Sequence, residues 1–133
     1  MADLHAKVRY ALRAALDLAE HYDGETPVKV GDVAARTAIP PKYLTHILLA
    51  LKRRVLVNST RGPAGGYWLA RRPGRITLAE VVDAVQGAAS GRRAPQLEEV
   101  PCDRAINRAW RQAESAAHEF LARLTLEDLL RQG

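Results

Sequence analysis

Apolar residues recur at steps of three and four along several stretches of the chain, which is the period of one face of an α-helix. The first stretch predicts a helix over residues 4–22, ended by the polar segment with Gly and Pro that follows it. Residues 33–39 fit a short second helix that stops before Pro40, because a proline disfavours helical backbone at the residue before it. Pro41 suits the first turn of a third helix, which we expect to run to about Arg54.

The third helix has one apolar and one polar face. Four residues at helical spacing make the face that we expect to be buried: Leu44, Ile47, Leu48 and Leu51. The opposite face consists mostly of side chains that can donate hydrogen bonds to phosphates or base edges: Lys42, Thr45, His46, Leu49, Lys52 and Arg53. Two helices and a tight turn come before this face, an order that is typical of a helix-turn-helix.

A β-hairpin is predicted directly after the third helix. Residues 56–60 and 67–70 are rich in strand-forming types, and the segment between them has the turn sequence Arg-Gly-Pro-Ala-Gly-Gly. The glycines allow the backbone to come close to another surface, and Arg61 lies at the tip. An arginine has little structural purpose there, whereas a narrow DNA minor groove attracts it. The pattern therefore predicts a wing.

A fourth helix and a linker are predicted next. Thr77 and Glu80 have the spacing of a capping box, and the apolar positions behind them predict a helix. Residues 88–101 lack periodicity and contain Gly, Ser and two Pro, so we expect a linker or mobile loop there. We therefore divide the chain into a winged helix-turn-helix domain over residues 1–87, this linker, and a C-terminal unit over residues 102–133.

The C-terminal unit carries a narrow apolar stripe over about five helical turns. Its residues alternate steps of four and three: Ile106, Trp110, Ala113, Ala117, Phe120 and Leu124. Such a stripe needs an apolar partner, either the chain's own domain or the same helix of a second copy. We favour the second copy and expect a homodimer, because helix-turn-helix regulators commonly read two half-sites through a two-fold axis. Thr125 and Asp128 then cap a short terminal turn.

Composition adds a regional positive charge to this picture. A chain of 133 residues, 47% of them hydrophobic, is long enough for one domain with an appendage. The formal net charge is +5, and residues from 91 onward balance their Arg against their Asp and Glu, so the excess lies before them. The segment 33–79 contains no acidic residue but nine basic ones: Arg36, Lys42, Lys52, Arg53, Arg54, Arg61, Arg71, Arg72 and Arg75. A basic region of this kind is what a surface that follows DNA phosphates requires.

Other classes of protein fit the sequence poorly. It contains no run of eighteen apolar residues and no apolar signal core, so we expect a cytoplasmic protein without a membrane partner. The histidines lack paired metal spacing, and nucleophile-elbow and Walker motifs do not occur, which argues against an enzyme and against a metal site. The open alternative is a winged-helix module that docks on proteins without specific DNA binding, although the acid-free segment 33–79 argues against it.

Three segments carry a resemblance to known proteins: RYALRAALDLA near the N-terminus, YLTHILLALKRRVLVNSTRGPAGGYWLA over residues 43–70, and ITLAEVVDAVQG behind it. The most specific part is the wing Arg61-Gly62-Pro63-x-Gly65-Gly66-Tyr67-x-Leu69. Together they closely resemble the family of winged-helix regulators that includes IscR, NsrR and CymR, and nearly the whole chain is covered. The resemblance implies a mainly α fold with a small β-hairpin and a long C-terminal dimerisation helix. It also implies a sequence-specific regulator of transcription that binds double-stranded DNA as a homodimer, with repression as the expected mode.

In that family the third helix enters the major groove and the wing reaches the adjacent minor groove. Carried over residue by residue, the resemblance implies base, phosphate or wing contacts from six residues: Lys42, Tyr43, Thr45, His46, Arg61 and Gly62. Lys52 and Arg53 lie beside the wing, and they fit either phosphate contacts or a solvated helix end that the helix dipole favours.

The chain departs from the iron–sulfur members of the family at its cysteines. Those members usually hold a cluster with three cysteines in the segment that matches residues 90–104, whereas Cys102 is the only cysteine here. One thiolate cannot ligate a cluster, although Glu98, Glu99, Asp103 and a cysteine from each subunit could in principle be recruited. We therefore expect no cofactor. We interpret Cys102 as a small buried hydrophobe, with a redox sensor as the alternative.

Overall fold

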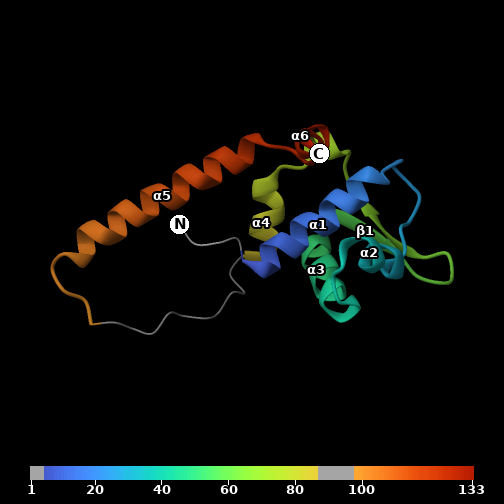
Figure 1. The fold of residues 1–133 in the computed structure, drawn as a ribbon, viewed down its shortest axis with the longest axis horizontal. Coiled ribbons are helices and arrows are strands. Elements are labelled where there is room, and N and C mark those ends of the chain that lie inside the picture. The colour runs from blue at the N-terminus through green and yellow to red at the C-terminus, as the bar shows by residue number, and fades with distance from the viewer. Residues whose placement is uncertain (1–4, 87–97) are drawn as a thin grey trace.

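The computed structural model describes residues 5–86 and 98–133, so most of the predicted linker lies outside the described residues. The described elements are, in order, α1 (Ala6–Glu20), α2 (Val30–Thr37), α3 (Pro41–Arg53), β1 (Val57–Thr60), β2 (Gly66–Leu69), the 3-10 helix η1 (Pro73–Arg75), α4 (Leu78–Gln86), α5 (Asp103–Arg123) and α6 (Leu126–Gln132). Figure 1 shows α1 to α4 and the hairpin gathered into one body, with α5 as a long arm that leads back to this body through α6.

The helices α1 and α3 lie where the apolar spacing predicts them. α1 falls inside the predicted range 4–22, and α3 begins at Pro41 as expected. A proline is tolerated there because the first N–H groups of a helix have no intrahelical partner and its fixed φ suits the helix. The first helical hydrogen bond of α3 follows at once, from the N–H of Leu44 to the carbonyl oxygen of Pro40 at 2.9 Å.

The helix α2 differs from its prediction at both ends. It begins at Val30 and ends at Thr37, so Ile39 lies outside it. Ala38 has a φ of 58°, and this left-handed conformation turns the chain out of the helix. Ile39 is nevertheless buried in the core. The prediction that Ile39 belongs to the second helix is wrong, because Ala38 turns the chain out of the helix, and Ile39 lies five residues after Ala34, off the helical step.

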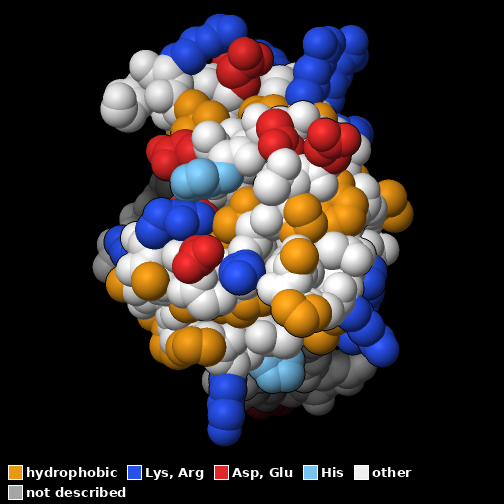
Figure 2. Space-filling view, turned by 90° about the vertical axis from the view of Figure 1, so that its right-hand side faces the viewer, with side chains coloured by type: hydrophobic (Ala, Val, Ile, Leu, Met, Phe, Trp, Pro, Cys, Tyr) orange, Lys and Arg blue, Asp and Glu red, His pale blue; other side chains and the backbone are white. Residues whose placement is uncertain are grey.

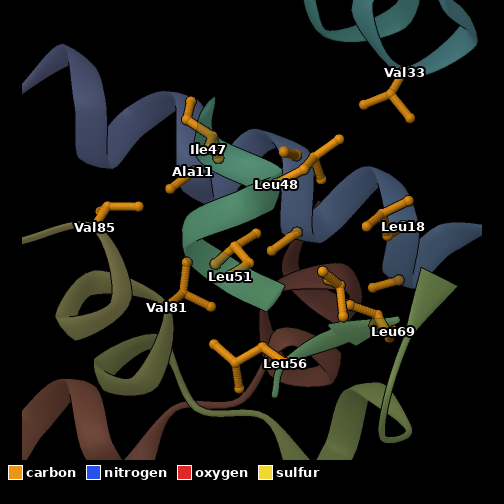
Figure 3. Close-up of a cluster of buried hydrophobic side chains, with 14 of the residues drawn as sticks. Ala11, Leu18, Val33, Ile47, Leu48, Leu51, Leu56, Leu69, Val81 and Val85 are labelled. Atoms are coloured by element: carbon orange, nitrogen blue, oxygen red, sulfur yellow. The ribbon is translucent and has the colours of Figure 1, made fainter. Parts of the chain in front are cut away.

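The core lies around the contact between α1 and α3, and α4 packs against both helices. α1 contributes small buried residues, Ala11, Ala14 and Ala15, which allow neighbouring helices to come close. The four residues predicted as the buried face of α3 are each at most 2% exposed. In Figure 3 the labelled side chains of α3 lie among those of α1, α4 and the hairpin. The prediction of this buried face is confirmed, and it leaves the opposite face of α3 outside the core.

The hairpin is antiparallel and is anchored to the segment before α2. Its strands pair with Val57 opposite Leu69. Val28 extends the sheet by one bridge, because its N–H donates to the carbonyl oxygen of Tyr67 at 2.8 Å and its own oxygen accepts from Tyr67 at 2.9 Å. Gly66 permits this approach, since a Cβ atom there would lie 2.3 Å from the oxygen of Val28. The base of the wing is thus fixed against the body.

Both predicted capping boxes form. The N–H of Glu80 donates to the hydroxyl of Thr77 at 3.2 Å, and the carboxylate of Glu80 accepts from the N–H of Thr77 at 3.1 Å. Thr125 and Asp128 make the same pair of hydrogen bonds, at 3.1 and 2.9 Å, at the start of α6. Each box satisfies donors that a helix N-terminus otherwise leaves without a partner.

The end of α5 is tied to the body by backbone hydrogen bonds. The N–H of Leu78 donates to the oxygen of Leu124 at 2.9 Å, and the N–H of Leu126 donates to the oxygen of Ile76 at 3.0 Å. Leu124 has extended backbone just after the last residue of α5, and its half-buried side chain packs against the core. Its predicted place on the helical stripe is therefore wrong, since the helix ends one residue before it although the spacing continues.

The rest of α5 is an exposed arm with no buried residue. The five other residues of the predicted stripe are all exposed, and the large ones strongly so: Ile106 at 55%, Trp110 at 64% and Phe120 at 56%. Within residues 5–86 and 98–133, one side-chain hydrogen bond joins α5 to the body, between His118 Nε2 and Asp83 Oδ2 at 2.9 Å. Neither α5 nor any other helix in this described part is long and apolar enough for a membrane span.

Candidate nucleic-acid interface

The outer face of α3 carries most of the residues predicted to contact DNA. Because the apolar face of α3 points into the core, these residues point away from it. All six predicted contact residues of this helix are exposed: Lys42, Tyr43, Thr45, His46, Lys52 and Arg53. Figure 1 shows α3 reaching the lower edge of the body, where no other helix covers it in that view. The structure therefore leaves all six side chains exposed, with Lys42, His46 and Arg53 on the outer face of α3 and Tyr43 at one edge of it.

Tyr43 is held at the edge of this surface by Tyr10 of α1, which Arg13 contacts in turn. The rings of Tyr10 and Tyr43 meet edge to face, with their centroids 5.3 Å apart. The guanidinium of Arg13 lies 5.7 Å from the centroid of the Tyr10 ring and donates to the carbonyl oxygen of Thr37 at 3.3 Å. The start of α3 is thus braced by α1 and the end of α2. The sequence gives no signal for this bracing, because the contacts join residues that are far apart along the chain.

Two residues of the surface are engaged by neighbouring groups. Lys52 Nζ donates to the hydroxyl of Ser59 at 2.7 Å, which joins the end of α3 to the first strand of the wing. An ammonium group has three donors, so Lys52 keeps two for another partner. The hydroxyl of Thr45 donates to the carbonyl oxygen of Pro41 at 3.0 Å, one turn back along α3. The hydroxyl hydrogen of Thr45 is therefore used within the helix.

The tip of the wing presents Arg61 and Gly62 to solvent. The turn is closed by the N–H of Gly65, which donates to the carbonyl oxygen of Gly62 at 2.9 Å. Gly62 has a φ of 102°, which residues with a side chain rarely adopt, and a Cβ atom on Gly65 would lie 2.4 Å from the oxygen of Thr60. The glycines of this turn are therefore required by its geometry, and they leave Arg61 on an unobstructed tip.

Arg36 belongs to the acid-free segment of the sequence but not to the open surface. Its Nε and Nη2 atoms donate to the two carboxylate oxygens of Asp17, each at 2.9 Å. Asp17 is buried on α1, and its hydrogen bonds raise the pKa of Arg36 above the usual value. Asp17 comes from a helix outside the segment 33–79. An acidic side chain therefore lies beside Arg36 although the segment itself contains none.

Arg71 is likewise paired, with Glu80 of the α4 capping box. Its Nη2 donates to Glu80 Oε2 at 2.7 Å, and its Nη1 donates to the carbonyl oxygen of Arg75 at 2.8 Å. Partial burial acts to raise the pKa of Glu80, but hydrogen bonds from Arg71 and from the Thr77 N–H outweigh it and lower that pKa below the usual value. The guanidinium of Arg71 is therefore engaged by groups of the domain itself.

The remaining basic residues of the segment make no salt bridge with the described residues: Lys42, Lys52, Arg53, Arg54, Arg61, Arg72 and Arg75. Figure 2 shows the molecule from the side on which the wing lies. The acidic side chains in this view lie in its upper and middle parts. The side chains that project at its lower edge are Lys or Arg and His, at the height that α3 occupies in Figure 1. Lys or Arg side chains also project at the upper edge of this view, so the positive charge is not confined to the end of the body that α3 occupies.

Cys102 is exposed at the start of α5, so its interpretation as a buried hydrophobe is wrong. Asp103 beside it accepts the N–H of Val100 at 2.7 Å. Elsewhere in residues 5–86 and 98–133, one group of side chains has the spacing of metal ligands, formed by Asp17, Glu20 and His21. Both carboxylate oxygens of Asp17 already accept hydrogen bonds from Arg36, which argues for a structural role of this group.

Comparison with known proteins gives a consistent result. The family described as Rrf2, iron-dependent transcriptional regulator, matches residues 4–132. The chain is 38% identical over 130 residues to the HTH-type transcriptional regulator IscR of Xenorhabdus nematophila, which covers 96% of this chain and 79% of that protein. Among solved structures, T. potens IscR has a TM-score of 0.76 at 27% identity, covering 98% of this chain and 88% of that one. CymR, the global cysteine regulator of B. subtilis, has a TM-score of 0.76 at 30% identity, covering 100% and 99%.

Proposed function

The chain belongs to the Rrf2 family of transcriptional regulators, and from that premise we propose that it binds duplex DNA as a homodimer, with α3 in the major groove and the wing in the adjacent minor groove. Its fold is the predicted winged helix-turn-helix with a long C-terminal helix. Its class is a DNA-binding regulator and not an enzyme, and the alternative of a module that docks only on proteins is not favoured.

The observation that carries the groove assignment is that α3 has one face of four buried residues and an exposed outer face. The buried face is satisfied by the chain's own core, so the outer face is free for a partner. That outer face presents Lys42 and His46 near its start and Arg53 at its end, each exposed. Ammonium, imidazole and guanidinium groups are the donors that recognise phosphates and the base edges of a major groove.

The wing supports the same assignment from a second element. Its base is fixed by Val28, and its first strand is joined to α3 by the hydrogen bond from Lys52 to Ser59. Arg61 stands on the tip of a turn whose glycines leave it unobstructed. An exposed arginine on a wing next to a major-groove helix is suited to the negative potential of a narrow minor groove.

Replacement of Arg61 tests this proposal. Because a good base contact contributes about 1–3 kcal/mol, Arg61→Ala should weaken binding to a duplex selected by the protein roughly tenfold or more. The thermal unfolding transition should stay nearly unchanged, since Arg61 is exposed. Arg131→Ala on α6 removes the same charge far from α3 and should leave DNA affinity close to that of the wild type. Equal losses from both substitutions would contradict a specific role for the wing.

For the homodimer we propose that two copies of α5 pack against each other in antiparallel orientation. The arm is about 31 Å long at 1.5 Å per residue, and its exposed stripe has the four-three spacing of a coiled coil. A two-fold axis near Ala113 puts Trp110 of one copy opposite the small Ala117 of the other, and Ile106 opposite Phe120. The large Trp110 then faces a small residue, and the large Ile106 and Phe120 cover each other.

The family description includes iron dependence, but the donor set of this chain does not fit an iron–sulfur cluster. The full sequence supplies one cysteine, and the neighbouring carboxylate of Asp103 is engaged by the N–H of Val100. We therefore infer that the chain regulates transcription without a cluster. An absorption spectrum and a metal analysis of anaerobically purified protein test this directly, and charge-transfer bands with stoichiometric iron and sulfide would contradict it.

We further propose that binding represses transcription, inside the cytoplasm where the chromosome is accessible. A reporter gene placed behind the selected duplex tests the mode of regulation. Expression of the chain should lower the reporter signal, and Arg61→Ala should restore it. A rise in the reporter signal would identify an activator instead.

A further inference from the structure

The outer face of α3 contains one large apolar side chain among its polar ones. Leu49 is 39% exposed, whereas the four leucine and isoleucine residues of the opposite face are buried. It lies seven residues after Lys42 and three after His46, so it shares their stripe near the middle of the outer face. Lys52 and Arg53 follow one turn later. An apolar group therefore occupies the centre of a surface that otherwise presents hydrogen-bond donors.

Thr45 adds a second apolar group directly beside Leu49. It lies one helical turn earlier, and its hydroxyl is turned back to the carbonyl oxygen of Pro41 at 3.0 Å. Since the two heavy substituents on its Cβ are a hydroxyl and a methyl, this hydrogen bond leaves the methyl as the free group on an exposed residue. Thr45 and Leu49 thus form a short apolar strip along α3, bordered by the basic residues named above.

We propose that this strip contacts the C5-methyl groups of thymines and makes thymine a required base in each half-site. The thymine methyl is the one apolar feature on the base edges of the major groove, and threonine methyls and apolar side chains are the groups that contact it. Cytosine at the same place would set its N4 donor against Leu49, where that donor loses its water and finds no acceptor. The strip therefore favours thymine and rejects cytosine, and the surrounding cations provide the approach to the phosphates.

This inference rests on the proposed major-groove role of α3, and the experiment separates the two. The full-length protein selects duplexes from a randomised pool, and each thymine of the selected half-site is then replaced by uracil. Uracil keeps every hydrogen-bonding edge and lacks only the methyl group. At one or two positions, uracil should weaken binding of the wild type roughly three- to fivefold, which corresponds to the free energy of burying one methyl group. At the position that Leu49 contacts, Leu49→Ala should bind the thymine and uracil duplexes with nearly equal affinity.

Matched variants identify the group that reads the methyl. Thr45→Ser keeps the hydroxyl and removes the methyl, so it should lower the thymine preference at the neighbouring position. Thr45→Val keeps a methyl and should retain that preference. Val55→Ala is the control for loss of an exposed apolar side chain, because Val55 is 69% exposed but lies beyond the end of α3. It should leave the preference unchanged.

Two kinds of result overturn the inference. A selected half-site without thymine, or one in which uracil changes nothing, shows that Leu49 is an ordinary surface residue. Full thymine preference in Leu49→Ala shows that another residue reads the methyl. A pool in which no sequence is enriched contradicts the proposed function itself, and this inference falls with it.

Discussion

The helices α3 and α5 are both amphipathic, but their apolar faces end up in opposite environments. The apolar face of α3 is covered by the chain itself, with Leu44 and Leu48 fully buried. The apolar stripe of α5 is bare, with Trp110 at 64% exposed. A helix whose apolar face is already buried offers a polar surface to its next partner, which suits DNA. A helix whose apolar face is uncovered needs another apolar surface, which suits a second copy of the same helix.

The largest effect should come from a cavity on the buried side of α3. Leu48→Ala removes a side chain that is 0% exposed, which should lower the free energy of unfolding by about 2–5 kcal/mol. Leu49→Ala changes the same residue type one position further along and should cost no more than about 0.5 kcal/mol. Urea unfolding of both variants measures the contrast. Similar losses from both would mean that the outer face of α3 is packed against something else.

The next effect concerns the bare stripe of α5. Trp110→Ala should weaken the dimer by at least about 2 kcal/mol, because a large aromatic side chain near the centre of an interface is the usual hot spot. Gln112→Ala, on the other side of α5, should leave the association unchanged. Sedimentation equilibrium gives both dissociation constants. A Trp110→Ala dimer as tight as the wild type would place the dimer interface elsewhere.

The two helices also end differently, and this predicts a stabilising change. After α3, the N–H of Leu56 donates to the oxygen of Leu51 at 3.0 Å and the N–H of Val55 to that of Lys52 at 2.9 Å, which is the Schellman pattern. Val55 has a φ of 58°, where glycine is usual and a β-branched residue is strained. Val55→Gly should therefore raise the free energy of unfolding by about 1 kcal/mol.

A control of opposite sign accompanies this change. Ala50→Gly introduces the same residue inside α3 and should destabilise the protein by about 1 kcal/mol. Thermal unfolding of the two variants separates relief of backbone strain from a general effect of glycine. Destabilisation by both substitutions would refute the strained C-terminus of α3.

The smallest effect concerns pH and the capping box of α4. Because the pKa of Glu80 is lowered from its ordinary 4.5, the charged carboxylate contributes stability above pH 4.5 that is lost as the pH falls through the folded-state pKa. The pair with Arg71 is partly exposed, so its contribution should be only about 0.5 kcal/mol. In a plot of the free energy of unfolding against pH, Glu80→Gln should reduce the loss of stability over this acidic range. An unchanged acid limb would show that Glu80 is equally charged in both states.

The sequence predicts the local elements well because their signals are local. The spacing of four apolar residues identifies the buried face of α3, and the pair Thr77 and Glu80 identifies the start of α4. The errors lie at helix ends. Leu124 continues the apolar spacing of α5 but follows its last residue, whereas Ile39 follows a left-handed turn and lies five residues after Ala34, off the helical step.

The candidate surface could be predicted only in part, because long-range pairing redistributes the charges. Arg36 and Arg71 look like members of a basic run, but Asp17 and Glu80 neutralise them from helices outside that run. The bracing of Tyr43 by Tyr10 also joins two distant positions. A single sequence contains no local signal for such contacts, whereas the outward direction of the α3 residues follows from helical period alone.

The central claim is that the surface of α3 and the wing binds the phosphates and grooves of duplex DNA. The most direct test is the affinity of the full-length protein for its selected duplex over a range of salt concentrations. If about three cations of each subunit neutralise phosphates, the plot of log affinity against log salt should have a slope of about −5, at about 0.9 per phosphate. A slope near zero would contradict the account, and it would favour a module that docks on proteins.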